Sequence, residues 1–407
     1  MSVKKLTRYL SLFVALSLPP VEAANQEIRA LFQPDPTQPS KNVFINKTPN
    51  SGYCADYPDE CAHQGMFSLR VPICFSTFTP MFSTNGVWVK VPADWRVVNV
   101  INQQTQQTHP VEVRISGIGS RYRLSKPVTE LTGEPNEAEA HRKLWVGSSW
   151  VYAAPPCEYS GVGFPGATTY QFFWKTPVLG SCNKVALFDI GHMEFEYLDI
   201  AYELRTPNPL SMATGVYTGS LPYSVGPGSA DFNMGPFFRA DDANLTLDFV
   251  LDVQHELKVS LPPGGDKVTM EPPGGWRSWI ETGRMPTDIY RDQLFHISAS
   301  SRFKVMMICN SLGGSECGIG NNEVGFSKFE VRLTLPAGIV GPGNSDGWSG
   351  TLMHNTWLGP FEPTRYVDRK PGNLRFQIPR RWIESLLKPG MNGTLWGNVT
   401  VIFDSEV

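Results

Sequence analysis

Short runs of alternating apolar and polar residues recur along most of the chain. Segments such as 67–75 ("FSLRVPICF") and 86–100 ("GVWVKVPADWRVVNV") have the two-residue period of a β-strand, and residues that favour turns separate them. Helical patterns are few. Residues 134–145 place acidic side chains first and basic ones last, which suits the helix dipole, and 380–388 contain helix formers before Pro389. The pattern predicts an all-β protein with minor helical connections.

The last strand-like segment, 395–403, poses a burial problem. Val399, Val401 and Phe403 alternate with Thr400 and Ile402, and only four residues follow Phe403. If no further strand covers this one, three or four core positions stay exposed, at about 1.5–3 kcal/mol each. The total, roughly 5–12 kcal/mol, compares with about 5–15 kcal/mol for the net stability of a whole domain. We therefore expect this domain to need a strand from another chain, the alternative being a sandwich that simply ends on a complete edge strand.

Length and composition indicate two packed domains. The 407 residues are 41% hydrophobic and 18% charged, which favours folded cores over disorder, and a net charge of −3 gives no indication of nucleic-acid binding. A stretch rich in Gly, Pro and Asp, 223–244, precedes the second half. A weak repeat between 212–225 and 391–403 suggests that each domain closes on a similar strand. We expect a first domain over 24–235 and a second over 236–407.

The first 23 residues have the pattern of a secretory signal. Lys4, Lys5 and Arg8 precede an apolar run of about ten residues, and Val21-Glu22-Ala23 offers a small-residue cleavage site. That run is too short to span a bilayer, so the mature protein is expected to be exported and soluble.

Export to an oxidising compartment favours disulfide bonds among the seven cysteines. Spacing favours Cys309–Cys317 around a Gly-rich turn, Cys157–Cys182, and Cys54–Cys61 with Cys74 unpaired. Either Cys54 or Cys61 could instead pair with Cys74. The cysteines and histidines lack the close spacing of a zinc site, and neither a metal nor a cofactor is expected.

The terminal alternating strand with its Trp396-Gly397 start, the segment "LDFVLDVQHELKVSLP" (247–262) and the segment 271–320 resemble the pilin domain of chaperone–usher fimbriae from Gram-negative bacteria. The N-terminal segment 33–69 is also similar to large fimbrial subunits.

This resemblance implies two immunoglobulin-like β-sandwich domains, the second a pilin-type domain that lacks its last strand. A periplasmic chaperone lends the missing strand, and a neighbouring subunit delivered through the outer-membrane usher later replaces it. The strand-binding residues implied here are Trp396, Gly397, Val399, Val401 and Phe403, with the carboxylate of Val407 reaching a basic cleft of the chaperone. The protein would be exported to the periplasm and then carried on a surface fimbrium. The late position of Cys309–Cys317 departs from the family pattern and leaves the strand map open.

In that family, an extra N-terminal domain occurs in tip adhesins and not in shaft subunits, so the resemblance favours a tip adhesin. The first domain of a tip adhesin attaches to a host or surface receptor, such as a glycan. The segment 26–32 ("QEIRALF") could still serve as a donor strand, although Pro34, Pro36 and Pro39 follow it closely. Aromatic platforms suit glycan binding, and core packing is the competing role for each. The candidates are Trp88, Tyr122, Trp145, Trp150 and Tyr152, with Asp94 or Arg121 as polar partners.

No catalytic constellation stands out, and we expect a protein that is not an enzyme. "GNSDG" (343–347) matches the G-x-S-x-G pattern around Ser345, but loop- or strand-like residues flank it where a nucleophile elbow needs a strand and a helix. The seven histidines are scattered. A non-adhesive structural or adaptor subunit, and a secreted β-sandwich lectin or enzyme outside fimbriae, remain as alternatives.

Overall fold

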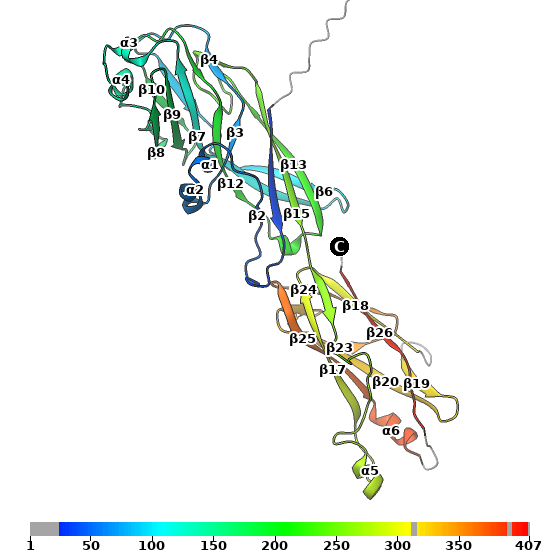
Figure 1. The fold of residues 1–407 in the computed structure, drawn as a ribbon. Helices are drawn as coiled ribbons and strands as arrows, with labels where there is room; N and C mark the ends of the chain where they lie inside the picture. Colours follow the sequence, from blue (N-terminus) through cyan, green and yellow to red (C-terminus); the bar gives the residue numbers. More distant parts are fainter. Residues whose placement is uncertain (1–23, 311–315, 389–392, 406–407) are drawn as a thin grey trace, which may run out of the picture.

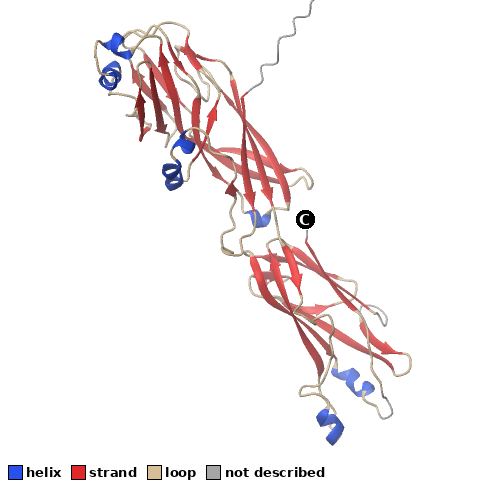
Figure 2. Cartoon of the chain, in the orientation of Figure 1, coloured by secondary structure: helices blue, strands red, loops and turns tan. Residues whose placement is uncertain are grey.

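The computed structural model describes residues 24–310, 316–388 and 393–405, so the predicted signal segment 1–23 lies outside the described residues. These residues form two β-sandwich domains that follow one another along a long axis (Figure 1). Strands dominate and helices are short (Figure 2). The predicted all-β class with two sandwich domains is confirmed.

The N-terminal domain is built on a 13-stranded sheet that curls over a large apolar core, with β5 and β10 forming a small second sheet. Its strands are β1 (Ala24–Phe32), β2 (Ile45–Asn46), β3 (Phe67–Val71), β4 (Phe75–Thr77), β5 (Gly86–Lys90), β6 (Arg96–Asn102), β7 (Thr108–Leu124), β8 (Glu158–Pro165), β9 (Thr169–Lys175), β10 (Ser181–Val185), β11 (Met193–Phe195), β12 (Leu198–Arg205), β13 (Gly215–Ser224), β14 (Phe238–Ala240) and β15 (Asn244–Val253). Short helices join them: α1 (Tyr53–Asp56), α2 (Pro58–Gln64), α3 (Val128–Thr132), α4 (Glu137–Leu144) and the 3₁₀ turn η1 (Pro209–Ser211). Helix α4 confirms the helix predicted over 134–145.

The C-terminal domain packs two sheets face to face. One has the order β16-β17-β25-β20-β19, with β23 beside β20, and the other has the order β22-β21-β24-β18-β26. The strands are β16 (Leu257–Ser260), β17 (Ile289–Ala299), β18 (Phe303–Cys309), β19 (Cys317–Asn321), β20 (Gly325–Thr334), β21 (Ile339–Gly341), β22 (Ser345–Asp346), β23 (Ser349–Leu352), β24 (Trp357–Pro363), β25 (Val367–Ile378) and β26 (Val399–Ser405). Two helices, α5 (Arg277–Thr282) and α6 (Arg380–Leu386), lie at the far end of this domain (Figure 1).

The boundary between the domains lies later than the sequence indicates. Strands β14 and β15, which follow residue 236, pair with β4, β1 and β13 inside the N-terminal domain. The inward apolar side chains of β15 are fully buried in the N-terminal core, whereas Leu257 and Val259 of β16 pack against the C-terminal core. The single strand-like run 247–262 is therefore two strands in two domains, and the predicted division at 235/236 moves to residues 254–256.

The predicted repeat also has a different structural meaning. Strand β13 lies between β6 and β15 in the sheet, so the segment 212–225 does not close a domain edge. Strand β26 by contrast lies at the end of its sheet. The two segments share an alternating pattern but occupy different kinds of position.

Three disulfides form between Cys54 and Cys61, Cys157 and Cys182, and Cys309 and Cys317. These are the pairs that spacing favours, and the two alternatives with Cys74 are wrong. The half-buried Cys74 is the free cysteine of the described residues.

Candidate functional site

The last described strand, β26, is paired along one edge only. It runs antiparallel to β18, with Phe303 opposite Ser405 at one end and Cys309 opposite Val399 at the other. Among the described residues, no strand pairs with its second edge. An edge of this kind presents a row of free backbone donors and acceptors, which is a template for a strand from another chain.

The inward side chains of β26 are only half-buried. Val399, Val401 and Phe403 pack against the C-terminal core, but all three retain exposed surface. The matching inward residues of the neighbouring β18, Val305 and Met307, are 0% and 1% exposed. The difference follows from the position of each strand, because β18 has a partner on both sides and β26 does not.

A long groove of about 1300 Å³ runs beside this free edge. One wall is the inner face of residues 393–403, and the opposite wall is formed by Leu257 and Val259 of β16 with the segment after it. Core side chains form the floor, namely Phe295, Phe329, Leu374, Phe376 and Ile378. The groove is larger than a typical small-molecule pocket of about 300–1,000 Å³. One side of the groove follows an edge strand along its length, so an added β-strand fits the groove better than a compact ligand does.

The predicted strand-binding residues divide between two faces. Val399, Val401 and Phe403 line the groove, as does Gly397. Trp396 borders the groove but is 65% exposed, because the alternation of the strand points its side chain outward. Val407 lies outside the described residues.

The segment before β26 leaves β18 and pairs with β19 instead. Trp396 and Gly320 exchange backbone hydrogen bonds, with N–O distances of 3.0 and 3.4 Å. The free edge beside the groove therefore extends from β26 back to Trp396.

The first strand of the N-terminal domain is not available as a donor. β1 runs parallel to β15 over its whole length, and Ile28, Ala30 and Phe32 are buried in the N-terminal core. The segment 26–32 thus completes its own domain, and the donor-strand alternative is wrong for the described residues.

Three of the predicted receptor contacts are core residues. Tyr122, Trp145 and Trp150 are at most 1% exposed. The Trp145 indole donates to the Tyr122 hydroxyl at 3.1 Å, and that hydroxyl lies 2.8 Å from Nδ1 of His141. Burial raises the pKa of Tyr122 well above its ordinary value. These side chains stabilise the sandwich, so their prediction as receptor contacts is wrong.

The other two candidates lie on the surface, in different surroundings. Trp88 on β5 is 47% exposed, and Tyr152 is 53% exposed and stacks on Tyr159 with ring centroids 6.0 Å apart. The structure does not bring Trp88 and Tyr152 together as one stacked pair. They remain candidates for separate contacts. Of the proposed polar partners, Asp94 pairs with Arg96 and Arg121 pairs with Glu196.

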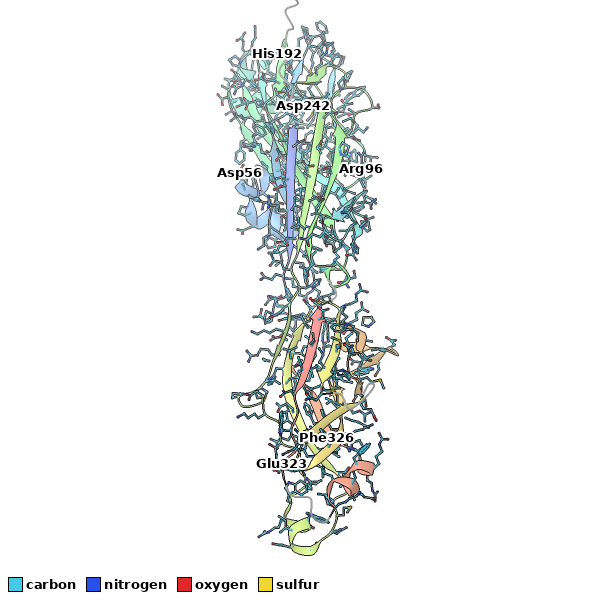
Figure 3. The ribbon with its side chains drawn as sticks, turned by 90° about the vertical axis from the view of Figure 1, so that its right-hand side faces the viewer. Asp56, Arg96, His192, Asp242, Glu323 and Phe326 are labelled. Atoms are coloured by element: carbon cyan, nitrogen blue, oxygen red, sulfur yellow. A yellow bond between two sulfur atoms is a disulfide. The ribbon has the colours of Figure 1, made fainter. Side chains whose placement is uncertain are left out.

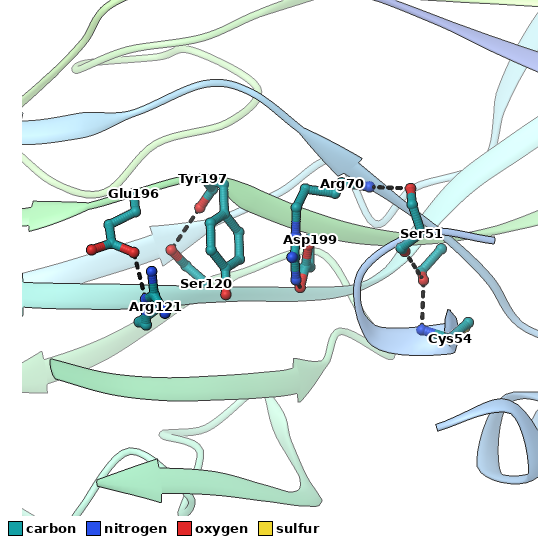
Figure 4. Close-up of polar contacts among 9 residues, drawn as sticks. Ser51, Cys54, Arg70, Ser120, Arg121, Glu196, Tyr197 and Asp199 are labelled. Atoms are coloured by element: carbon teal, nitrogen blue, oxygen red, sulfur yellow. Dashed lines mark hydrogen bonds and ion pairs between the residues drawn. The ribbon is translucent and has the colours of Figure 1, made fainter. Parts of the chain in front are cut away.

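A polar surface on one face of the N-terminal sheet was not predicted from the sequence. Arg70 of β3 donates two hydrogen bonds to the buried Asp199 of β12, at 2.7 and 2.8 Å, and its guanidinium lies 4.0 Å from the centre of the Tyr197 ring (Figure 4). Burial raises the pKa of Asp199, and the hydrogen bonds from Arg70 oppose that shift. The pairing joins positions far apart in sequence, so no local motif could have indicated it.

A stacked aromatic group covers the adjoining part of this face. Phe173 lies flat over Gly117 and Gly119, where an added Cβ would come within 2.5 Å of its ring. Tyr53 of α1 stacks on Phe173 with a centroid distance of 3.7 Å. Helices α1 and α2, joined by the Cys54–Cys61 disulfide, are held on the sheet by this stack.

The described residues do not form a nucleophile elbow at Ser345, a cluster of three metal-ligating side chains or a membrane-spanning helix. Ser345 lies in β22, an exposed two-residue strand followed by β23, so the strand-to-helix context of a nucleophile elbow is not formed there. No group of three metal-ligating side chains occurs in the part of the chain that the structure describes. Within the same residues, none of the helices is long and apolar enough to cross a membrane.

No protein-family model matches the chain. No curated protein matches it in sequence. Solved structures do match it over nearly its whole length. CfaE, the adhesive subunit of the CFA/I fimbria of enterotoxigenic Escherichia coli, matches 95% of this chain and 94% of its own at 10% identity, with a TM-score of 0.28.

Two further matches come from chaperone complexes. A chain of the chaperone–tip adhesin complex of CFA/I fimbriae covers 95% of this chain and 97% of its own at 11% identity, with a TM-score of 0.26. A chain of the CsuC–CsuE pre-assembly complex, from the archaic chaperone–usher Csu pili of Acinetobacter baumannii, covers 94% and 98% at 11% identity, with a TM-score of 0.22. The chain is thus similar over its length to tip adhesins of chaperone–usher fimbriae, the resemblance that its sequence predicts.

Proposed function

We propose that this chain is the adhesive tip subunit of a chaperone–usher fimbria. Its C-terminal domain accepts a β-strand from a periplasmic chaperone and then from the adjacent fimbrial subunit at the outer-membrane usher. Its N-terminal domain attaches the fimbrium to a receptor on a host or other surface. The protein is exported to the periplasm, ends on the cell surface, and acts by binding rather than by catalysis.

The observation that carries the proposal is the open edge of β26 beside the apolar groove. Filling the groove with three or four apolar side chains of an added strand stabilises the complex by roughly 5–12 kcal/mol before the strand's ordering cost. Seven residues of β26 extend over about 23 Å, so a strand of similar length covers the edge. Main-chain hydrogen bonds then supply affinity, and the alternate side chains supply selectivity.

The position of β1 supports the tip over the shaft. A shaft subunit must accept one strand and donate another, but in this chain β1 is locked between β15 and β2. A subunit that only accepts a strand ends the fibre. This arrangement leaves the N-terminal domain free to contact a receptor.

We infer that the receptor is a glycan and that its contacts lie among the exposed aromatic and charged side chains of the N-terminal domain. Trp88 and Tyr152 offer apolar ring faces, and Arg121 offers a charged donor that is 45% exposed. Such a combination suits stacking on a sugar ring with polar contacts to its hydroxyl groups.

The test is periplasmic expression of the full chain with and without the chaperone of a fimbrial operon. The proposal predicts a stable 1:1 complex with the chaperone, and a free chain that is less stable to denaturant and more readily cleaved by protease than the complex. Equal stability to denaturant and equal protease resistance of the chain with and without the chaperone would contradict the strand-accepting role. Glycan-array binding by the purified complex then separates an adhesin from a non-adhesive adaptor subunit.

A further inference from the structure

Two exposed aromatic side chains lie together on the outer face of the C-terminal domain, at the far end of the groove. Trp396 is 65% exposed and Phe326 of β20 is 62% exposed. Figure 3 labels Phe326 near the end of this domain, next to Glu323. Both residues stand out because each belongs to a strand segment whose other face is packed in the core.

The backbone pairing places both side chains on the same face. Gly320 of β19 is opposite Phe326 on one side and opposite Trp396 on the other. Residues directly opposite one another in antiparallel strands project from the same face of the sheet. Ile319, which precedes Gly320 in β19, points inward and lines the groove. Neighbouring residues of a strand project from opposite faces, so Gly320 and its two partners, Phe326 and Trp396, face outward.

Gly320 makes this arrangement possible. A Cβ at this position would lie 2.1 Å from Cδ1 of Phe326, so the Phe326 ring rests directly on the glycine backbone. The ring thereby extends over β19 toward Trp396. We call Trp396, Gly320 and Phe326 the outer aromatic surface.

The outer aromatic surface is continuous with the strand-binding groove. The free edge beside the groove reaches back to Trp396, so an added strand passes directly beside that residue, at the usual spacing of about 4.8 Å. β19 and then β20, which carries Phe326, follow the Trp396 segment away from the edge. Three strand spacings therefore separate Phe326 from the added strand, a distance of about 14 Å. A single strand can touch Trp396, but only a folded partner that extends over the outer face can touch Phe326.

We propose that the outer aromatic surface is a second contact site for the chaperone, engaged by the body of the chaperone beyond the strand that it lends to the groove. This inference rests on the proposed strand-accepting function and adds to it a partner surface outside the groove. Aromatic residues are enriched in protein interfaces, and tryptophan is frequent among the few positions that dominate them. An apolar patch on the chaperone is the chemistry that fits them.

The experiment compares the full chaperone with a synthetic peptide that carries only its lent strand. Binding of both is measured for the full chain and for its Phe326→Ala and Trp396→Ala variants. Phe326→Ala is expected to weaken chaperone binding about tenfold while peptide binding stays unchanged, and Trp396→Ala is expected to weaken both. Phe164→Ala, which removes a similarly exposed phenylalanine (53%) from the N-terminal domain, is the matched control and changes neither.

Each outcome decides one question. If Phe326→Ala leaves chaperone binding unchanged, the second contact site is refuted while the groove function stands. If the peptide fails to bind the unmodified chain, the strand-accepting function itself fails. If Phe326→Ala weakens binding of the peptide and of the chaperone equally, the substitution acts on folding. The second variant is then Phe326→Glu, which adds a charge at the same exposed position. If Phe326→Glu does not weaken chaperone binding selectively, the inference is overturned. Selective loss of binding to the adjacent subunit instead of the chaperone also overturns it.

Discussion

Truncation of Phe403 should have a larger effect in the complex than in the free chain. The Phe403 ring contacts Phe295 and Phe303, with centroid distances of 5.5 and 6.2 Å, and it is half-buried because the groove beside it is open. Phe→Ala at a fully buried site costs about 3–5 kcal/mol, so we expect about 1.5–2.5 kcal/mol in the free chain. An added strand buries the ring, and the full loss then appears in the complex. The difference predicts that Phe403→Ala weakens strand binding by about 10- to 70-fold.

The assay is a thermodynamic cycle with a matched control. Stability is measured by denaturant unfolding of the C-terminal domain in the free chain and in its complex with the strand peptide, and the dissociation constant of the peptide is measured separately. Phe361→Ala is the control, since Phe361 is 0% exposed and lies on β24, away from the groove. It should cost about 3–5 kcal/mol in both states and leave peptide binding unchanged. Equal destabilisation by the two variants in the free chain, with unchanged peptide binding for both, would refute the reasoning.

Further predictions concern the rest of the chain. Trp150→Ala should destabilise the N-terminal domain by about 3–5 kcal/mol because Trp150 is fully buried, whereas Tyr152→Ala should change its stability by less than about 0.5 kcal/mol; melting curves that rank the two the other way contradict their placement. His255 joins the domains, since Nε2 donates to the Met212 carbonyl at 2.8 Å and Nδ1 lies 3.1 Å from Ser300 Oγ. Burial lowers the pKa of His255, so the unfolded chain binds the proton more readily than the folded chain. The free energy of unfolding should therefore fall as the pH drops below about 6.5, and it should fall less steeply in His255→Gln. An identical pH dependence of stability in both proteins disproves this. Replacing Cys157 and Cys182 by alanine opens a loop with a sequence separation of 25 and should lower the free energy of unfolding by about 3.5 kcal/mol. The same replacement of Cys54 and Cys61, with a separation of 7, should lower it by about 2.5 kcal/mol. Denaturant unfolding measures both losses, and a larger loss for the shorter loop argues against the loop-closure account.

Local patterns in the sequence were sufficient for the elements of the candidate groove. The alternation through Val399, Val401 and Phe403 identifies a strand with an inward apolar face, and in the described residues this strand is paired along one edge only. The short separation between Cys309 and Cys317 likewise made their pairing predictable. These features depend on residues that are close together in the chain.

Features that depend on distant residues were not predictable in the same way. The run 247–262 alternates without interruption, so nothing local shows that β15 and β16 belong to different domains. Tyr122, Trp145 and Trp150 look like a binding platform in sequence, but the curl of the large sheet encloses them. Phe326 and Trp396 lie 70 residues apart in the chain and pair with the same residue, Gly320, from its two sides. Only the strand pairing shows that they are neighbours.

Hydrogen exchange at the backbone amides of β26 tests the central claim most directly. Half of the peptide groups of an edge strand face its partner, and the others face away from it. In the free chain, the amides of 399–405 that face β18 should be protected, and those that face the groove should exchange rapidly. Adding the chaperone or its strand peptide should protect the second set and leave the first set unchanged. If all β26 amides are already protected in the free chain, or if the partner protects none of them, the C-terminal domain is complete by itself and the strand-accepting account is contradicted.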